Sequence, residues 1–331
     1  MKLNPIFSSG AVFPAKRPIR FFGEGEGHAE LSFNGKKYEI DAEGGRWGFE
    51  VEPMEYGGPY ELEFTSEGET VVFNDIYIGE VILFAGQSNI AFLLGSSNTP
   101  KEKYEDIDNL RIVNVNDLNE GTFSWRRAKK DWIAEASALC YLVGRELSLL
   151  GNVAIGVIQC TQGASVIESW MPEGTLEKLG INIPENEKFF DHYYEEYSVW
   201  NREGYLYGAK LSKIIPYTLT GVVWYQGESD ASEAEGLVYE RELSELIRMM
   251  RERFADSSLP FTVVQLADTH ERMALGPGWR LIQEAQERIS AHEELVYTVI
   301  SKDVCENDDI HPQSKEALAE RIAEVIKKHY L

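Results

Sequence analysis

The stretch that decides the fold is Glu80-Val81-Ile82-Leu83-Phe84-Ala85-Gly86-Gln87-Ser88-Asn89-Ile90-Ala91-Phe92. Its continuous apolar run, Val81 to Ala85, predicts a strand that is buried on both faces. The run breaks at Gly86 and apolar spacing resumes at Ile90, which indicates a turn followed by a helix. Open α/β folds carry their chemistry at the carboxyl ends of parallel strands. The stretch therefore predicts such a fold with Ser88 at that edge, where a helix N-terminus faces any anion that forms.

After residue 78, apolar strand candidates alternate with amphipathic helix candidates. The strand candidates are 110–115, 153–158, 219–225, 261–266 and 295–300, and the helix candidates are 136–150, 207–215, 240–254, 281–289 and 315–328. This alternation is typical of a parallel sheet covered by helices on both faces. We therefore expect a doubly wound catalytic domain over residues 79–331.

Residues 1–78 have a different pattern, in which short alternating segments are separated by turn residues. The candidate strands are 18–22, 29–33, 37–40, 47–51, 60–64, 71–73 and 76–78. Asn34-Gly35 predicts a tight hairpin turn. Short strands at roughly even spacing predict a small N-terminal β-sandwich domain. We expect His28, in a Gly/Glu-rich segment of this domain, to be a solvated loop residue.

The formal net charge of −23 over 331 residues argues against nucleic acid and anionic membranes as partners, since both require basic patches. Three cysteines (Cys140, Cys160 and Cys305) without a short-spaced pair predict neither a disulfide framework nor a metal site. The first residues contain no apolar segment of a signal peptide, and no run approaches the length of a membrane span. We expect a cytoplasmic protein without a metal, and the sequence leaves homo-oligomerisation open.

Residues 171–206 interrupt the alternation, because aromatic residues there are mixed with charges and no buried strand is visible. The aromatic set is Phe189, Phe190, His192, Tyr193, Tyr194, Tyr197, Trp200 and Tyr205. One interpretation is an amphipathic excursion that packs its rings on the domain. The other is a lid or rim whose rings stack on sugars, since long loops in compact domains are often functional.

Turns after the predicted strands contain the groups that ester hydrolysis by a serine requires. Ser88 is the candidate nucleophile, and His311, between the last strand and the closing helix, is the candidate base. Asp308, three residues before it, is placed to hold the other imidazole nitrogen. The N–H groups of Ser88 and Gly163 and the side-chain amide of Gln226 are candidate donors to the oxyanion. No G-x-S-x-G motif occurs, which disfavours an α/β-hydrolase.

Several ordered motifs resemble those of the SGNH hydrolase superfamily, and more closely its sialate O-acetylesterase (carbohydrate acetylesterase) family. They are Gly86-Gln87-Ser88-Asn89, Thr161-Gln162-Gly163-Ala164, Trp224-Tyr225-Gln226-Gly227-Glu228 and Asp308-Asp309-Ile310-His311-Pro312, together with a similar front end at Leu3-Asn4-Pro5 and Gly57-Gly58-Pro59-Tyr60. The resemblance covers essentially the whole chain and implies an SGNH, flavodoxin-like sheet.

The resemblance implies that Ser88 is the nucleophile, His311 the base and Asp308 its partner, with Gly163 and Gln226 completing the oxyanion hole. The further positions that match are Gln87, Asn89, Glu168, Glu228 and Trp170, which either support the turns or contact substrate. Two departures matter. Many members have Trp-Gly-Gly where this chain has Gln162-Gly163-Ala164. Many also have Asp two residues before the histidine, so Asp309 is the alternative orienting acid.

The expected function is that of a serine O-acetylesterase that acts on acetylated carbohydrate through an acetyl-enzyme and needs no cofactor. O-acetylated sialic acid is the first expected substrate, and acetylxylan or another acetylated plant sugar is the alternative. A sialate carries a carboxylate, for which Arg202 and Arg280 are the candidate partners. The hypothesis from another class is a non-catalytic carbohydrate-binding protein, which the complete set of catalytic residues disfavours.

Overall fold

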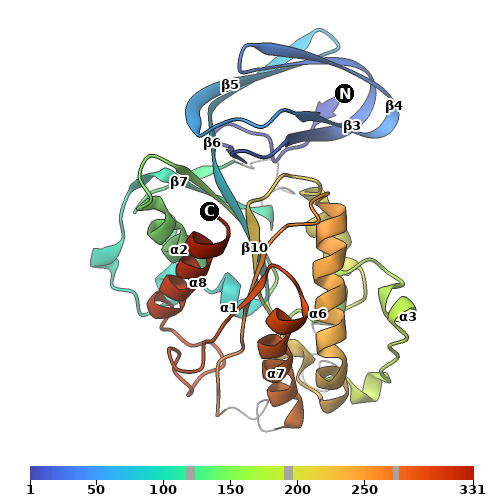
Figure 1. Ribbon diagram of the computed structural model, residues 1–331, viewed down its shortest axis with the longest axis vertical. Coiled ribbons are helices and arrows are strands. Elements are labelled where there is room, and N and C mark those ends of the chain that lie inside the picture. The colour runs from blue at the N-terminus through green and yellow to red at the C-terminus, as the bar shows by residue number, and fades with distance from the viewer. Residues whose placement is uncertain (117–123, 190–196, 271–275) are drawn as a thin grey trace.

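The computed structural model describes residues 1–116, 124–189, 197–270 and 276–331. One long strand, β6 (Glu69–Gly86), runs through both the N-terminal part and the larger, C-terminal part of the molecule. It leaves the N-terminal hairpins and becomes the central strand of the larger part (Figure 1). The apolar stretch that begins at Val81 forms the buried second half of this strand, as its sequence predicts.

The larger part contains a parallel sheet with the strand order β7-β9-β6-β10-β11-β12. These strands are β7 (Ile107–Asn114), β9 (Ala154–Thr161), β10 (Gly221–Tyr225), β11 (Phe261–Val264) and β12 (Val296–Val299), and a short antiparallel strand, β8 (Arg126–Ala128), pairs with β7. The chain fills one side of β6 with β7 and β9, then crosses to the other side for β10. Such a reversal of strand order creates a crevice at the carboxyl ends of the strands.

Long helices cover both faces of this sheet (Figure 1). Helices α2 (Ala138–Ser148) and α8 (Glu316–His329) pack together on one face, and α6 (Glu233–Arg253) and α7 (Pro277–His292) pack together on the other. The short helices are α1 (Ser88–Ala91), α3 (Thr175–Leu179) and α5 (Tyr205–Ala209), and the 3₁₀ turns are Leu94–Ser96, Lys101–Lys103, Ile133–Glu135, Ile167–Trp170, Glu185–Glu187, Leu211–Lys213 and Glu228–Asp230. The fold is therefore the doubly wound α/β architecture that the sequence predicts.

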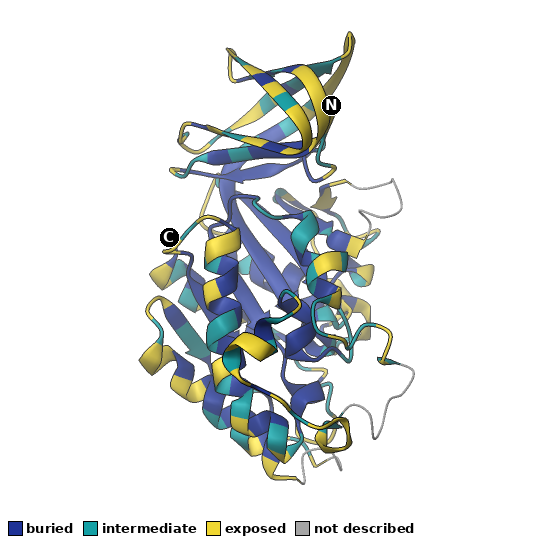
Figure 2. Cartoon of the chain, turned by 90° about the vertical axis from the view of Figure 1, so that its right-hand side faces the viewer, coloured by how far each residue is buried: buried dark blue, intermediate teal, exposed yellow. Residues whose placement is uncertain are grey.

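Sequence signals explain where the long helices begin. Ser232 and Glu235 form a capping box at the start of α6, which satisfies backbone donors that would otherwise have no partner. Helix α7 begins at Pro277, whose missing N–H costs nothing at a first helical position. Figure 2 shows the central strands buried along their length and the exposed residues gathered on the outer faces of the helices.

The N-terminal part is built from two long antiparallel hairpins. Its strands are β1 (Lys2–Leu3), β2 (Val12–Pro14), β3 (Ile19–Phe33), β4 (Lys36–Val51), β5 (Gly57–Ser66) and the first half of β6. The order β4-β3-β5-β6 lies within one curved sheet. Two separate sheets stacked as a sandwich are not seen in the described part of the chain. His28 lies within β3 beside Asp41, not in a loop, although it is exposed as expected.

The pairing partners of β6 change between Ile78 and Gly79. Ile78 pairs with Gly57 of β5, and Gly79 pairs with Ala154 of β9. A single strand thus crosses the position at which two domains are expected to meet.

An aromatic cluster joins the two parts of the molecule. The ring of Tyr217 lies 5.5 Å from Phe7 and 6.2 Å from Trp125 between centroids. Its hydroxyl donates to the carbonyl of Val12 at 2.7 Å, and the indole of Trp125 donates to the carbonyl of Ile6 at 2.9 Å. Burial of such large rings with their polar groups paired is strongly favourable. The N-terminal part is therefore packed firmly on the larger part.

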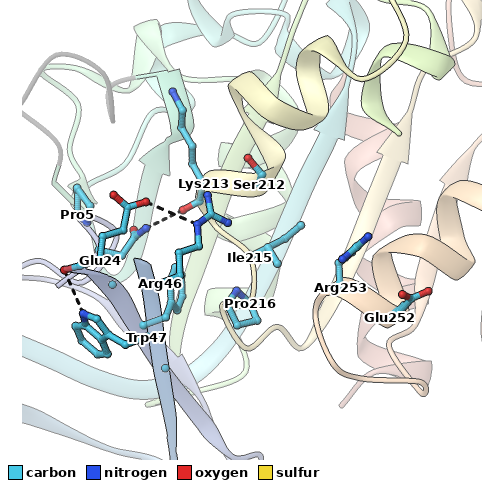
Figure 3. Close-up of a pocket in the computed structure, with 14 residues that line it drawn as sticks. Pro5, Glu24, Arg46, Trp47, Ser212, Lys213, Ile215, Pro216, Glu252 and Arg253 are labelled. Carbon is cyan, nitrogen blue, oxygen red and sulfur yellow. Dashed lines mark hydrogen bonds and ion pairs between the residues drawn. The ribbon is translucent and has the colours of Figure 1, made fainter. Parts of the chain in front are cut away.

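A cavity of about 520 Å³ lies between the two parts (Figure 3). Glu24 and Arg46 form one wall, and Ile215, Pro216 and Arg253 form the other. It lies at the amino ends of the parallel strands, because Pro216 precedes β10. Ligands of open α/β sheets bind at the opposite, carboxyl ends.

Among the helices described, none is long and apolar enough to cross a membrane.

Candidate active site

The turn after β6 brings Ser88 to the carboxyl edge of the sheet. Gly86 adopts φ +135°, and a Cβ at this position would lie 2.1 Å from the carbonyl oxygen of Tyr225. Only glycine allows this conformation and this close approach. The N–H of Gln87 then donates to the same carbonyl at 3.0 Å. Ser88 follows as the first residue of α1.

The structure brings Ser88 and His311 together over 223 positions of sequence. Nε2 of His311 lies 2.8 Å from Oγ of Ser88. His311 lies in the loop between β12 and α8, and its ring stacks on Phe92 with centroids 6.2 Å apart and planes 21° apart. An imidazole at this distance can accept the serine proton as the oxygen attacks. The two residues predicted to act as nucleophile and base therefore lie within hydrogen-bonding distance of each other.

The carboxylate beside the other imidazole nitrogen belongs to Asp309. Its Oδ1 lies 3.8 Å from Nδ1 of His311 and accepts the backbone N–H of His311 at 2.7 Å. Asp308 is exposed, and among the described residues no hydrogen bond or ion pair joins it to His311. The prediction that Asp308 orients His311 is therefore not met in this structure. The turn Asp309-Ile310-His311, closed by the side chain of Asp309, presents the alternative acid instead.

Gly163 lies beside Ser88, as the predicted oxyanion hole requires. A Cβ at Gly163 would come within 3.9 Å of the Cβ of Ser88. Within the described part of the chain, the N–H groups of Ser88 and Gly163 donate to no other group. Two unengaged backbone donors beside a nucleophile are suited to an oxyanion.

Gln226, the third predicted donor to the oxyanion, does not face the cavity. Its side chain is fully buried. Its Nε2 donates to the carbonyl of Ser165 at 2.7 Å, to Oε1 of Gln87 at 3.2 Å and to Asp230. These acceptors already use both amide hydrogens. The role assigned to Gln226 is thus corrected, since its amide braces the turns beneath the site.

Gln87 has a similar bracing role. Its Oε1 accepts the backbone N–H groups of Gly227 and Ser229, each at 3.3 Å. Its Nε2 donates to the hydroxyl of Ser229 at 3.3 Å. These contacts fasten the turn after β6 to the turn after β10, so Gln87 supports the position of Ser88.

Trp170 and Glu168 support the site from below. Trp170 is fully buried, its Nε1 donates to the hydroxyl of Ser165 at 3.1 Å, and its ring meets Trp224 edge to face at 5.8 Å. It cannot contact a substrate. Glu168 is also buried and accepts a hydrogen bond from Lys188 at 2.7 Å.

Asn89 and Glu228 form a buried pair next to Ser88. Nδ2 of Asn89 donates to Oε1 of Glu228 at 2.6 Å and to the carbonyl of Ile310 at 2.9 Å. Burial raises the pKa of Glu228 above its ordinary value, and the hydrogen bond from Asn89 opposes this rise. Lys315 donates to Oδ1 of Asn89 at 2.8 Å. Sequence reasoning missed Lys315, although it lies only four residues after His311.

A cavity of about 390 Å³ opens over Ser88 and His311. It is lined by Gln87, Ser88, Gln162, Gly163, Ala164, Phe189, Tyr197, Trp200, Glu228, Ser229, Ile310 and His311. Small-molecule sites commonly have such a size and such a mixture of aromatic and polar groups. Three rings of the predicted aromatic segment, Phe189, Tyr197 and Trp200, are therefore on the wall of the cavity. Phe190, His192, Tyr193 and Tyr194 lie outside the described residues.

Polar contacts hold this aromatic rim in place. Asn201 donates to the carbonyl of Ala164 at 2.7 Å and accepts the N–H of Val166 at 3.1 Å. The N–H of Phe189 donates to Glu235 at 2.9 Å. The rim is thus attached both to the turn that contains Gly163 and to helix α6.

Comparisons with known proteins show which chains this one is similar to. The family model described as carbohydrate esterase, sialic acid-specific acetylesterase, matches residues 78–328. The human sialate O-acetylesterase is 26% identical over 328 residues, which cover 87% of this chain and 61% of the human protein. The mouse sialate O-acetylesterase is 26% identical over 334 residues, which cover 83% of this chain and 62% of the mouse protein. The chain thus spans about three fifths of the length of the curated relatives it matches.

A solved structure shows the same fold over nearly the whole chain. It is described as a novel carbohydrate acetylesterase from Xanthomonas citri, and it is 25% identical with a TM-score of 0.85. The alignment covers 99% of this chain and 75% of the Xanthomonas chain.

Proposed function

Because the chain belongs to the sialic acid-specific acetylesterase family of carbohydrate esterases, we propose that it is a serine O-acetylesterase that acts on acetylated carbohydrate. The observation that carries the proposal is the distance of 2.8 Å between Oγ of Ser88 and Nε2 of His311, at the floor of a cavity with an aromatic rim. The names of the human and mouse relatives support the acetyl ester as the bond that is cleaved.

The proposed reaction has two steps. Oγ of Ser88 attacks the acetyl carbonyl carbon while His311 accepts the hydroxyl proton, and the N–H groups of Ser88 and Gly163 stabilise the oxyanion. The sugar hydroxyl leaves with the proton from His311. His311 then removes a proton from water, which attacks the carbonyl carbon of the acetyl-enzyme. His311 returns this proton to Oγ of Ser88 as the ester bond breaks and acetate leaves. Asp309 stabilises the imidazolium in both steps by its nearby negative charge.

O-acetylated sialic acid is the first proposed substrate, on the strength of the names of the family and its relatives. The second candidate is a neutral acetylated sugar such as acetylxylan. It is favoured by the charge of the cavity, where the ionisable groups among the described lining residues are Glu228, Tyr197 and His311, with no lysine or arginine. Neither expected carboxylate partner lines the cavity, because Arg202 lies over Tyr205 and Arg280 pairs with Glu284.

The test measures acetate release from O-acetylated sialic acid, from acetylated xylo-oligosaccharide and from an aryl acetate. We expect Ser88→Ala to lower kcat by several orders of magnitude on every cleaved substrate while leaving Tm unchanged. Ser212→Ala is the matched control, because its hydroxyl donates to the carbonyl of Gly208 at 2.9 Å and lies beside the other cavity. Undiminished turnover by Ser88→Ala would overturn the proposed mechanism. The two sugars decide between the substrate classes.

A further inference from the structure

Lys315 is a fully buried lysine beside the catalytic pair. Its Nζ donates to Oδ1 of Asn89 at 2.8 Å and lies 5.1 Å from the centroid of the Phe92 ring, on which His311 stacks. Burial lowers the pKa of Lys315 to about 8, so at neutral pH the group is mostly an ammonium. Burying an ammonium costs several kcal/mol unless its partners compensate. The cost of burying this lysine therefore suggests that its ammonium has a specific function.

The three polar neighbours of Asn89 determine which way its amide faces. An ammonium only donates hydrogen bonds, whereas the carboxylate of Glu228 and the carbonyl of Ile310 only accept them. The amide must therefore direct Oδ1 to Lys315 and Nδ2 to Glu228 and Ile310, at the distances of 2.8, 2.6 and 2.9 Å. Asn89 is 2% exposed, so water offers it little alternative. One orientation of the amide satisfies all three neighbours.

The orientation of this amide bears directly on the catalytic geometry. Asn89 follows Ser88 in the chain, and Ile310 precedes His311. The hydrogen bond from Asn89 to Ile310 thus ties together the two segments whose side chains meet at 2.8 Å. Without the ammonium, Oδ1 of Asn89 loses its donor in a buried site, and the amide is held from one side only, through Nδ2. An amide held from one side can shift, and because Nδ2 is bonded to the carbonyl of Ile310, such a shift would move the histidine loop relative to Ser88.

We propose that Lys315 is a positioning residue of the esterase, which fixes the amide of Asn89 and thereby holds His311 at hydrogen-bonding distance from Ser88. This inference rests on the proposed function, since it assigns Lys315 a part in the chemistry of that site. Lys315 touches neither substrate nor reacting atoms. Its effect on the reaction passes through Asn89.

The test compares Lys315→Met with the wild type in the hydrolysis of an aryl acetate. A misplacement of about 1 Å between reacting groups costs about 100-fold, so we expect kcat to fall by about 10- to 100-fold, with KM nearly unchanged. Methionine fills the buried space without a charge, so the protein should remain folded with a Tm close to that of the wild type. Lys328→Met, at an exposed position of α8, is the matched control and should keep full activity.

A double-mutant cycle with Asn89→Ala separates positioning from a general structural effect. If Lys315 acts through Asn89, the double variant should have the same kcat as Asn89→Ala alone. Additive losses, an unchanged kcat in a folded Lys315→Met protein, or a change confined to KM would each refute the inference. If the methionine variant does not fold, Lys315→Gln, which keeps a hydrogen-bond donor, is measured in the same double-mutant cycle with Asn89→Ala. Ser88→Ala distinguishes the two failures, because only a wrong function leaves that variant active.

Discussion

Replacing Asp309 by asparagine isolates the effect of one negative charge on His311, the proposed catalytic base. Asparagine keeps the side-chain oxygen that accepts the backbone N–H of His311 at 2.7 Å, so the turn is preserved. The charge that lies 3.8 Å from Nδ1 is lost. The imidazolium formed when Ser88 attacks is therefore less stabilised, and kcat should fall.

The size of this fall follows from distance and exposure. Two unit charges 3.8 Å apart attract by about 1 kcal/mol in water and by about 4 kcal/mol near a protein surface of lower dielectric. The side chains of His311 and Asp309 are 37% and 51% exposed, so solvent screening places the value near the lower limit, at about 1–2 kcal/mol. This corresponds to a decrease in kcat of about 5- to 30-fold.

The assay is the steady-state hydrolysis of an aryl acetate by Asp309→Asn and by Asp308→Asn, its matched neighbour. Asp308 is exposed, so its substitution should change kcat by less than about twofold. The reverse ranking, with a loss of about 10⁴-fold for Asp308→Asn as in a buried triad, would refute the reasoning. It would mean that the loop turns in the working enzyme and presents Asp308 to Nδ1.

Two further predictions concern stability. Gly86→Ala should destabilise the protein by about 2–4 kcal/mol in urea unfolding, because its Cβ would lie 2.1 Å from a carbonyl oxygen at φ +135°. Gly163→Ala, whose Cβ meets nothing closer than 3.9 Å, should unfold like the wild type, and equal losses would show that the turn can relax. Burial, then repulsion by Glu168 and Glu235, raises the pKa of Glu242 well above its ordinary value. The folded state therefore holds a proton that the unfolded state releases, and its stability falls as the pH rises above the ordinary glutamate pKa. Glu242→Gln should raise Tm more at pH 8 than at pH 5, whereas Glu324→Gln, at an exposed position, should not. An equal rise in Tm at the two pH values would contradict the raised pKa of Glu242.

The parallel sheet could be predicted because its strands are buried on both faces. Strands such as β6 and β9 are apolar over successive residues where helices cover them, and this pattern is visible in the sequence. The N-terminal hairpins were harder to predict. Residues 24–28 of β3 are exposed, so their glycines and glutamates have no apolar alternation and resemble a turn. Backbone pairing with β4 continues the strand through these residues. Backbone hydrogen bonds do not depend on the side chains, so the amino-acid composition does not reveal them.

For the site residues, too, the sequence predicts where a residue lies in the chain but not which way its side chain points. Sequence places Gln226 correctly in the turn after β10, but the direction of its side chain depends on tertiary contacts. Gly227, at φ +143°, turns the chain immediately afterwards, and the buried carboxylate of Asp230 then accepts from the amide of Gln226. A donor that has such a partner is satisfied beneath the turn and has no reason to face the cavity.

Lys315 could have been found from the periodicity of α8. The buried residues of this helix include Leu318, Ala319 and Ile322, which stand three, four and seven positions after Lys315. A lysine on the apolar stripe of a helix is rarely buried without a partner. The pattern therefore identifies an unusual lysine, whereas its partner, Asn89, lies 226 positions away and becomes visible only in the fold.

Residue 164, in the turn beside Ser88, has an unusual backbone conformation. The φ of Ala164 is +50°, a conformation that costs an alanine about 1–2 kcal/mol. Its carbonyl accepts hydrogen bonds from Asn201 at 2.7 Å and from Trp200 at 3.3 Å, which offset that cost. The turn beside Ser88 is therefore held in a strained conformation by the aromatic rim. A substitution that loosens the rim should disturb the position of the Gly163 N–H as well as the binding of sugar, so kcat and KM should change together.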